Sequence, residues 1–176
     1  MKTRTILCAL ALLAIFAAAP PAKSQEQSEN PLDQIAWMVG GKWQADGDQG
    51  PDGKPFHVEW SAHWGANHRT IDFAVSFLTD GKLVPEYNGL YAYNPAKKKV
   101  IFVYTDKEGN LTEGDAEISG ERQEMEFDII GTDGATHPFR STVVRTGSDA
   151  YDWNVQNQKN GDWTVMFALK YKRTRG

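Results

Sequence analysis

The sequence predicts an all-β protein, an antiparallel up-and-down barrel of about ten strands with a short helix before the first strand. From residue 42 onward, apolar and polar residues alternate with a period of two, which is typical of strands that bury one face. The segments between these runs are short and rich in Gly, Asn and Asp, which favours antiparallel neighbours. Closure into a barrel removes the two edges that ten strands would otherwise leave. An open, strongly curved sheet is the alternative.

Residues 1–24 have the features of a signal peptide. Two basic residues precede an uncharged apolar run over residues 6–19, and residues 22–24 place small side chains where a signal peptidase cuts, before Gln25. The apolar run is shorter than the roughly 20 residues that span a bilayer. We therefore expect cleavage, a periplasmic or secreted protein, and no integral membrane segment afterwards. A retained N-terminal anchor is the alternative.

Cleavage would leave an acidic chain without cysteine. The chain carries 19 Lys and Arg against 23 Asp and Glu, and the predicted signal holds three of the basic residues and none of the acidic ones, so the mature net charge is −7. Such a chain is a poor partner for nucleic acid. Because Cys8 lies in the signal, a mature domain without thiols excludes cysteine nucleophiles, disulfides and cysteine-ligated metal centres.

A polar leader over residues 25–30 precedes a single domain over residues 31–174. A short helix opens the domain, because Asn30 suits the N-cap and Pro31 suits the first helical position. Its apolar stripe consists of Leu32, Ile35 and Ala36, and two glycines at residues 40 and 41 end it.

Ten alternating runs follow the helix. The first begins at Trp43, and the others cover residues 56–64, 70–77, 87–93, 100–104, 111–118, 125–129, 139–143, 151–155 and 163–171. On the last of them one face is predicted to carry the apolar set Trp163, Val165, Phe167, Leu169 and Tyr171, with Arg173 at its end.

The two ends of the domain carry a pair of short motifs. Gly41-Lys42-Trp43 opens the first strand, and Tyr171-Lys172-Arg173 closes the last. This arrangement resembles the calycin superfamily of lipocalin-like barrels, in which a terminal Arg lies over the Trp of a Gly-x-Trp motif, a favourable cation–π pair. The chain is similar to uncharacterised bacterial calycin-like families over residues 31–174. The resemblance implies a barrel whose usual cargo is a small apolar molecule, and it implies no known reaction.

One calycin branch, the nitrobindin-like barrels, binds haem through a histidine close to the C-terminus. The last histidine of this chain is His137, and the final two predicted strands have none. Haem is therefore not expected, and no cofactor is firmly implied.

The predicted hairpin over residues 57–72 concentrates polar side chains. If His63 and His68 face each other across its turn, the register also pairs Glu59 with Asp72. Two imidazoles are ligands for a divalent metal, and facing carboxylates bind a cation or share a proton. His63 and His68 are thus candidate metal ligands, and Glu59 and Asp72 are weak catalytic candidates. The alternative is a solvated outer face, since the opposite face of the hairpin is the apolar one.

The barrel interior is the other candidate site, because its aromatic side chains either fill it or line a cavity. The predicted lining residues are Trp43, Trp60, Phe73, Tyr91, Phe102, Phe127, Trp153 and Phe167. Three hypotheses follow: a binding protein for a small apolar or amphipathic molecule, an enzyme or metal-binding protein that uses the hairpin, and a structural or interaction domain of the cell envelope. The first two differ in whether the hairpin's polar residues line the cavity or face outward.

Overall fold

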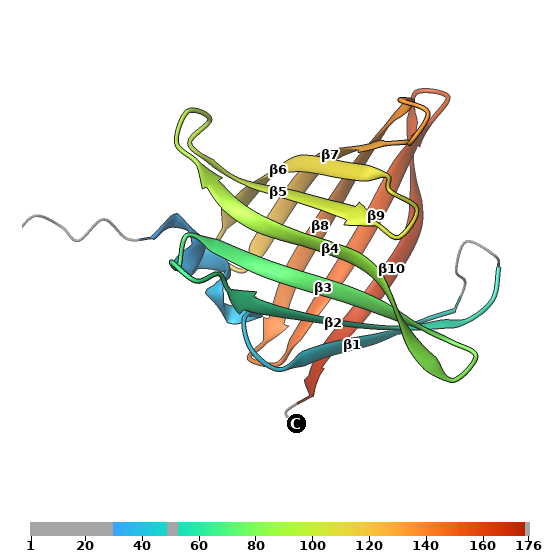
Figure 1. Ribbon diagram of the computed structural model, residues 1–176, viewed down its shortest axis with the longest axis horizontal. Helices are drawn as coiled ribbons and strands as arrows, with labels where there is room; N and C mark the ends of the chain where they lie inside the picture. Colours follow the sequence, from blue (N-terminus) through green and yellow to red (C-terminus); the bar gives the residue numbers. More distant parts are fainter. Residues whose placement is uncertain (1–29, 49–52, 175–176) are drawn as a thin grey trace, which may run out of the picture.

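The computed structural model describes residues 30–48 and 53–174, so the predicted signal peptide and most of the predicted leader lie outside the described residues. It is a closed antiparallel barrel in which each strand pairs with its neighbours in the chain and β1 pairs with β10 (Figure 1). The predicted fold class is therefore confirmed. Among the described residues, no helix has the length and apolar character needed to cross a membrane.

The elements follow the predicted order. They are the 3₁₀ helix η1 (Pro31–Met38) and the strands β1 (Lys42–Gly47), β2 (Phe56–Trp64), β3 (Thr70–Thr79), β4 (Lys82–Asn94), β5 (Lys99–Asp106), β6 (Leu111–Ser119), β7 (Arg122–Ile130), β8 (Thr136–Gly147), β9 (Ala150–Lys159) and β10 (Asp162–Thr174).

The helix η1 begins where the sequence predicts. The Asn30 side chain accepts a hydrogen bond from the Leu32 backbone N–H at 3.2 Å and donates one to the His68 carbonyl at 2.8 Å. The side chains of Leu32 and Ile35 are completely buried. After η1, Gly40 and Gly41 take positive φ values of 83° and 74°, which glycine adopts without strain, and the chain turns there into β1.

The barrel closes between Trp43 on β1 and Arg173 on β10, which are direct partners in the register. The Arg173 guanidinium carbon lies 4.4 Å from the centroid of the Trp43 ring, and the same guanidinium donates a hydrogen bond to the Trp37 carbonyl. The predicted contact between the two motifs is therefore present. It joins the first strand, the last strand and η1 at one place.

One prediction about β10 is wrong. Val165 pairs with Gln156 and Phe167 pairs with Val155, so Met166 is an extra residue in a β-bulge. A bulge exchanges the faces on either side of it. Trp163 and Val165 therefore point outward, away from the inner face that carries Phe167 onward. Val165 is 53% exposed, in agreement with an outer position.

Candidate ligand-binding site

The two ends of the barrel differ. The turns that connect strands alternate between the ends, and η1 lies at the end that holds the β2–β3, β4–β5, β6–β7 and β8–β9 turns (Figure 1). We call this the closed end and the opposite end the open end. Hydrogen bonds from Trp43 to Met38 and from Arg173 to Trp37 fix η1 to the strands at the closed end, and Gly40, just after η1, donates one to Ala62.

The interior of the closed end is filled. The Trp43 ring lies 5.7 Å from Trp37, 5.0 Å from Tyr151 and 6.3 Å from Trp60, measured between ring centroids. The polar atoms of these rings are paired as well. Trp43 Nε1 donates to the Met38 carbonyl at 2.9 Å, and Trp60 Nε1 donates to the Tyr151 hydroxyl at 2.5 Å. This half of the barrel has no room for a ligand among these side chains.

Toward the middle and the open end, inward-pointing aromatic side chains are only half-buried. These are Phe56, Phe73, Phe77, Tyr87, Tyr104, Phe127, Phe139, Trp153 and Phe167. Their alternation with outward residues places them on the inner face of the sheet. We infer that their remaining exposure is directed into the barrel, and we call the space that they face the lumen.

The rings form a continuous wall. Phe77 lies 6.2 Å from Tyr87, Tyr87 lies 5.4 Å from Tyr104, and Tyr104 lies 6.0 Å from Phe73. Phe102, which lies 6.3 Å from Tyr104, continues the row to Phe127 at 5.6 Å, and Phe127 stacks on Phe139 at 5.5 Å. Edge and offset contacts at these distances favour rigid rings.

The tyrosine hydroxyls of the lumen are neutral. Burial raises the pKa of Tyr91, and its neighbour Tyr104 raises it further. Burial also raises the pKa of Tyr104, although a hydrogen bond with the Thr112 side chain acts in the opposite direction. The lumen thus offers uncharged hydroxyl groups that both donate and accept hydrogen bonds.

The predicted lining residues divide between the two regions. Trp43, Trp60, Tyr91 and Phe102 are buried, and the first two belong to the packed closed end. Phe73, Phe127, Trp153 and Phe167 keep exposed surface in the lumen. The sequence reasoning missed Tyr87 and Tyr104, although both continue the alternation of their strands through Tyr91 and Phe102 and could have been found that way. Ligand binding by any of these residues stays a prediction.

The register predicted for the 57–72 hairpin is wrong. His63 faces Asp72, and Glu59 faces Ser76. His68 lies in the turn with a positive φ of 53° and stacks on Trp64 at 5.3 Å. The proposed His63–His68 and Glu59–Asp72 pairs therefore do not form. The reason is that the two registers differ by an even number of residues, so both keep apolar side chains opposite apolar ones, and the pattern alone did not distinguish them.

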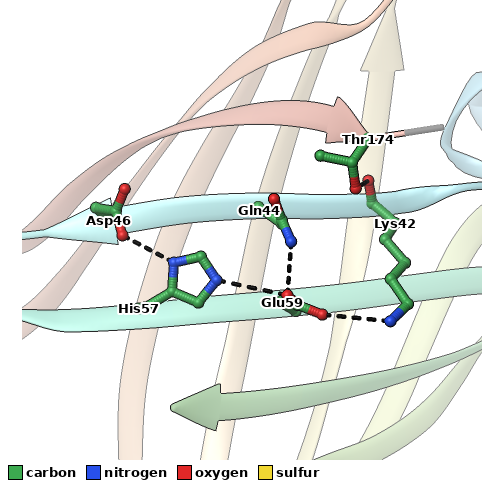
Figure 2. A network of polar contacts seen from close by, with 6 residues as sticks. All are labelled: Lys42, Gln44, Asp46, His57, Glu59 and Thr174. Atoms are coloured by element: carbon green, nitrogen blue, oxygen red, sulfur yellow. Dashed lines mark hydrogen bonds and ion pairs between the residues drawn. The ribbon is translucent and has the colours of Figure 1, made fainter. Parts of the chain in front are cut away.

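The polar side chains of the hairpin face outward. His57 lies between Asp46 and Glu59, with 2.8 Å from Nδ1 to the Asp46 carboxylate and 3.6 Å from Nε2 to Glu59 (Figure 2). Gln44 donates to Glu59 at 2.5 Å, and the Lys42 ammonium lies 3.6 Å from it. These contacts link β1 to β2 on the outer surface of the barrel.

The remaining hairpin candidates are more exposed. The side chains of His63 and Asp72 are 74% and 40% exposed, with 4.0 Å between Nε2 and the carboxylate. Within residues 30–48 and 53–174, no three His, Cys, Asp or Glu side chains are grouped so that they could hold a metal ion. The outward position of these candidates weakens the enzyme hypothesis.

Two hollows also lie on the outer surface. The larger, about 610 Å³, extends from Asn94 at the end of β4 over β5 to β8 and reaches Trp163 on β10, and its lining includes several carboxylates. The other, about 420 Å³, lies over β8 to β10. Most of their lining residues point outward, but the larger hollow also touches the inward residues Phe102, Phe127 and Phe139, and the other touches Trp153. We place the candidate site in the lumen because the inward aromatic rings gather there.

Comparisons with known proteins support the fold. No protein-family model and no curated protein matches the chain. The crystal structure of Rv2717c from M. tuberculosis is similar, with a TM-score of 0.57 and 16% identity over 82% of this chain and 98% of that one. The structure of EF1p2_mFAP2b bound to DFHBI aligns over 81% of this chain and 99% of that one, with 11% identity and a TM-score of 0.37. The first likeness shows the barrel fold alone, and the second is too distant to carry an argument.

Proposed function

We propose that this protein binds a small apolar or amphipathic molecule in the open half of a calycin-like barrel, and that its N-terminal sequence directs the barrel to export. The observation that carries the proposal is the contrast between a sealed closed end and inward aromatic rings that stay half-exposed. An aromatic-walled cavity with a few polar groups is the usual form of a site for a small molecule.

The energetics favour occupation of the lumen. Exposed apolar surface is unfavourable in water by about 25 cal/mol per Å². A ligand that covers Phe127, Trp153 and Phe167 removes that cost, and the rigid wall keeps the loss of side-chain entropy on binding small. The open end supplies the access that a fully packed core lacks.

Titration with 1-pyrenebutanol tests the proposal, because its pyrene emission changes when the molecule leaves water for an apolar site. We expect saturable binding by the wild type. Phe167→Asn should weaken binding about tenfold, because it places an amide in the apolar wall. Val165→Asn is the matched control, since Val165 is two residues from Phe167 but points outward because of the bulge at Met166. The affinity of this variant should stay within about twofold of wild type.

Circular dichroism of both variants shows whether they are folded, and a titration of Phe127→Asn provides a second lumen variant if Phe167→Asn is not. Absence of saturable binding to the wild type would overturn the proposal. So would an equal loss of affinity in the lumen variants and the Val165→Asn control. Native mass spectrometry of protein purified from its own host would identify a retained molecule directly.

A further inference from the structure

The wall of the lumen has a chemical character beyond its aromatic content. Cross-strand partners Tyr91, Phe102, Gly114, Phe127, Phe139 and Asn157 form one inward row from β4 to β9. Parallel rows run on either side, from Gly89 to His137 and from Val100 to Val155. At these described strand positions no side chain is a carboxylate, an ammonium or a guanidinium, and the imidazole of His137 at the open end is the one basic group.

A negatively charged ligand would therefore have no counter-charge in this part of the lumen other than the His137 imidazole at the open end. An ionised carboxylate that leaves water without a partner loses several kcal/mol of hydration. The Thr112 and Ser141 hydroxyls of these rows are neutral and buried, and the phenol of Tyr104, which keeps exposed surface, is neutral as well. This phenol suits the hydroxyl or carbonyl of an uncharged molecule.

The open end adds an electrostatic barrier against anions. Burial raises the pKa of the Tyr87 phenol, and the neighbouring Tyr104 and the carboxylates Glu86, Asp106 and Glu108 raise it further. Lys107 lies 2.8 Å from Glu86 and compensates one of these charges. The described connections at this end contain the acidic residues Asp48, Asp80, Glu108 and Asp133 and the basic residues Lys54 and Lys107. An anion entering here meets a net negative rim.

We propose that the lumen selects uncharged amphipathic molecules, such as alcohols, phenols and ketones with an apolar body, and excludes carboxylates such as fatty-acid anions. This selectivity rests on the proposed function, because it describes the same site. It follows from two independent features, the uncharged inward rows and the acidic rim. It identifies a ligand class for a barrel whose apolar wall alone would accept either class.

The test compares 1-pyrenebutanol with 1-pyrenebutyrate, which share the aromatic body and differ in the end group. At pH 8 the wild type should bind the alcohol at least about tenfold more tightly than the carboxylate, because the carboxylate is desolvated without a partner. Equal affinities, or tighter binding of the carboxylate, would overturn the selectivity and leave the proposed function intact. Binding of neither probe would overturn both.

A matched pair of variants locates the selectivity in the lumen. Ile129 faces inward beside His137 and Thr112, and its neighbour Ile130 faces outward. Ile129→Arg supplies a counter-charge inside, so the preference for the alcohol should fall about tenfold or reverse. Ile130→Arg adds the same charge outside and should keep the wild-type ratio. If both variants change the ratio equally, net charge and not the lumen sets the preference, and the inference is wrong.

The Thr112→Arg variant is a second way to place the charge if Ile129→Arg does not fold. Its side chain occupies the same inward row on β6. A folded Thr112→Arg protein that keeps the wild-type preference would also contradict the inference. The ratio of the two affinities is the readout throughout, because a general loss of stability lowers both affinities and leaves their ratio unchanged.

Discussion

The closed half and the open half of this barrel use the same kinds of side chain in opposite ways. In the closed half, Trp37, Trp43, Trp60 and Tyr151 contact one another, and the polar atoms of Trp43 and Trp60 are hydrogen-bonded. In the open half, Tyr87, Tyr104 and other inward rings keep exposed surface. The difference teaches that an aromatic-rich inner face does not by itself make a core. A covering element, here η1, converts one half into a core and leaves the other as a cavity.

Alkaline pH should cause the largest loss of stability, because it acts on tyrosines buried in the closed half. Burial raises the pKa of the closed-half residues Tyr151 and Tyr171 above the ordinary value of 10.0. In the unfolded chain these tyrosines release protons near pH 10, whereas the folded protein retains them. The free energy of unfolding is therefore unaffected below pH 10 and falls as the pH rises through the folded-state pKa.

We expect cooperative unfolding above about pH 11, with loss of circular dichroism coinciding with the rise of tyrosinate absorbance at 295 nm. Tyr171→Phe removes one ionisable group from the closed half and should move the midpoint to higher pH. A gradual rise of absorbance with unchanged circular dichroism would show that the buried tyrosines ionise without unfolding, and would contradict this prediction.

Two tryptophans compare the halves directly. Trp43 is completely buried at the closed end, whereas Trp153 faces the lumen and is half-buried. Trp43→Ala should lower the free energy of unfolding by about 3–5 kcal/mol, because it leaves a cavity among packed rings. Trp153→Ala should lower it by about 1–2 kcal/mol, because part of the side chain is already in contact with solvent.

Urea denaturation of both variants measures the difference. Equal losses would mean that the two halves are packed to the same density, and the lumen would then not be open. Binding of 1-pyrenebutanol should show the reverse order, with the larger loss of affinity in Trp153→Ala.

Two arginines that lie over indole rings give the smallest expected difference in the free energy of unfolding between the two regions. The Arg173 side chain is 17% exposed and lies over Trp43 at the closed end, whereas Arg140 is exposed and lies 4.6 Å over Trp163 on the outer face. Arg173→Ala should reduce the free energy of unfolding by about 1–2 kcal/mol, since a desolvated cation–π pair is lost together with the bond to Trp37. Arg140→Ala should cost about 0.5 kcal/mol or less.

Urea denaturation again provides the measurement, and Arg173→Lys tests the role of the guanidinium plane. Lysine retains the charge and loses the geometry that reaches both the Trp43 ring and the Trp37 carbonyl, so an intermediate stability is expected. If Arg173→Ala were no more harmful than Arg140→Ala, the contact at the seam of the barrel would not contribute to closure.

Local patterns explain most of the fold that could be predicted. Asn30 and Pro31 mark the start of η1, period-two alternation marks the strands, and the Trp43 and Arg173 motifs mark the seam. Two failures share one cause. The β2–β3 register and the bulge at Met166 are both matters of pairing, and the apolar pattern of a single strand does not report how that strand aligns with its neighbour.

The candidate site was predicted only in part. The aromatic inner face was visible in the sequence, and half of the predicted lining residues keep exposed surface in the lumen. The metal and catalytic candidates depended on a register that the hairpin does not adopt. The uncharged inward rows could not be predicted from the sequence. Each row takes one residue from each of several strands, so its members are far apart in the chain.

The sequence by itself determined that this chain forms antiparallel strands with one aromatic-rich face, because alternation and turn chemistry act between residues close in the chain. The tertiary structure alone decided which of those aromatic side chains form a core and which line a lumen. Trp43 and Tyr104 both point inward, yet only Trp43 lies under η1 and against rings from β2 and β9. Burial depends on elements brought together from distant parts of the chain, so it followed from the closure of the barrel and from the position of η1 at one end.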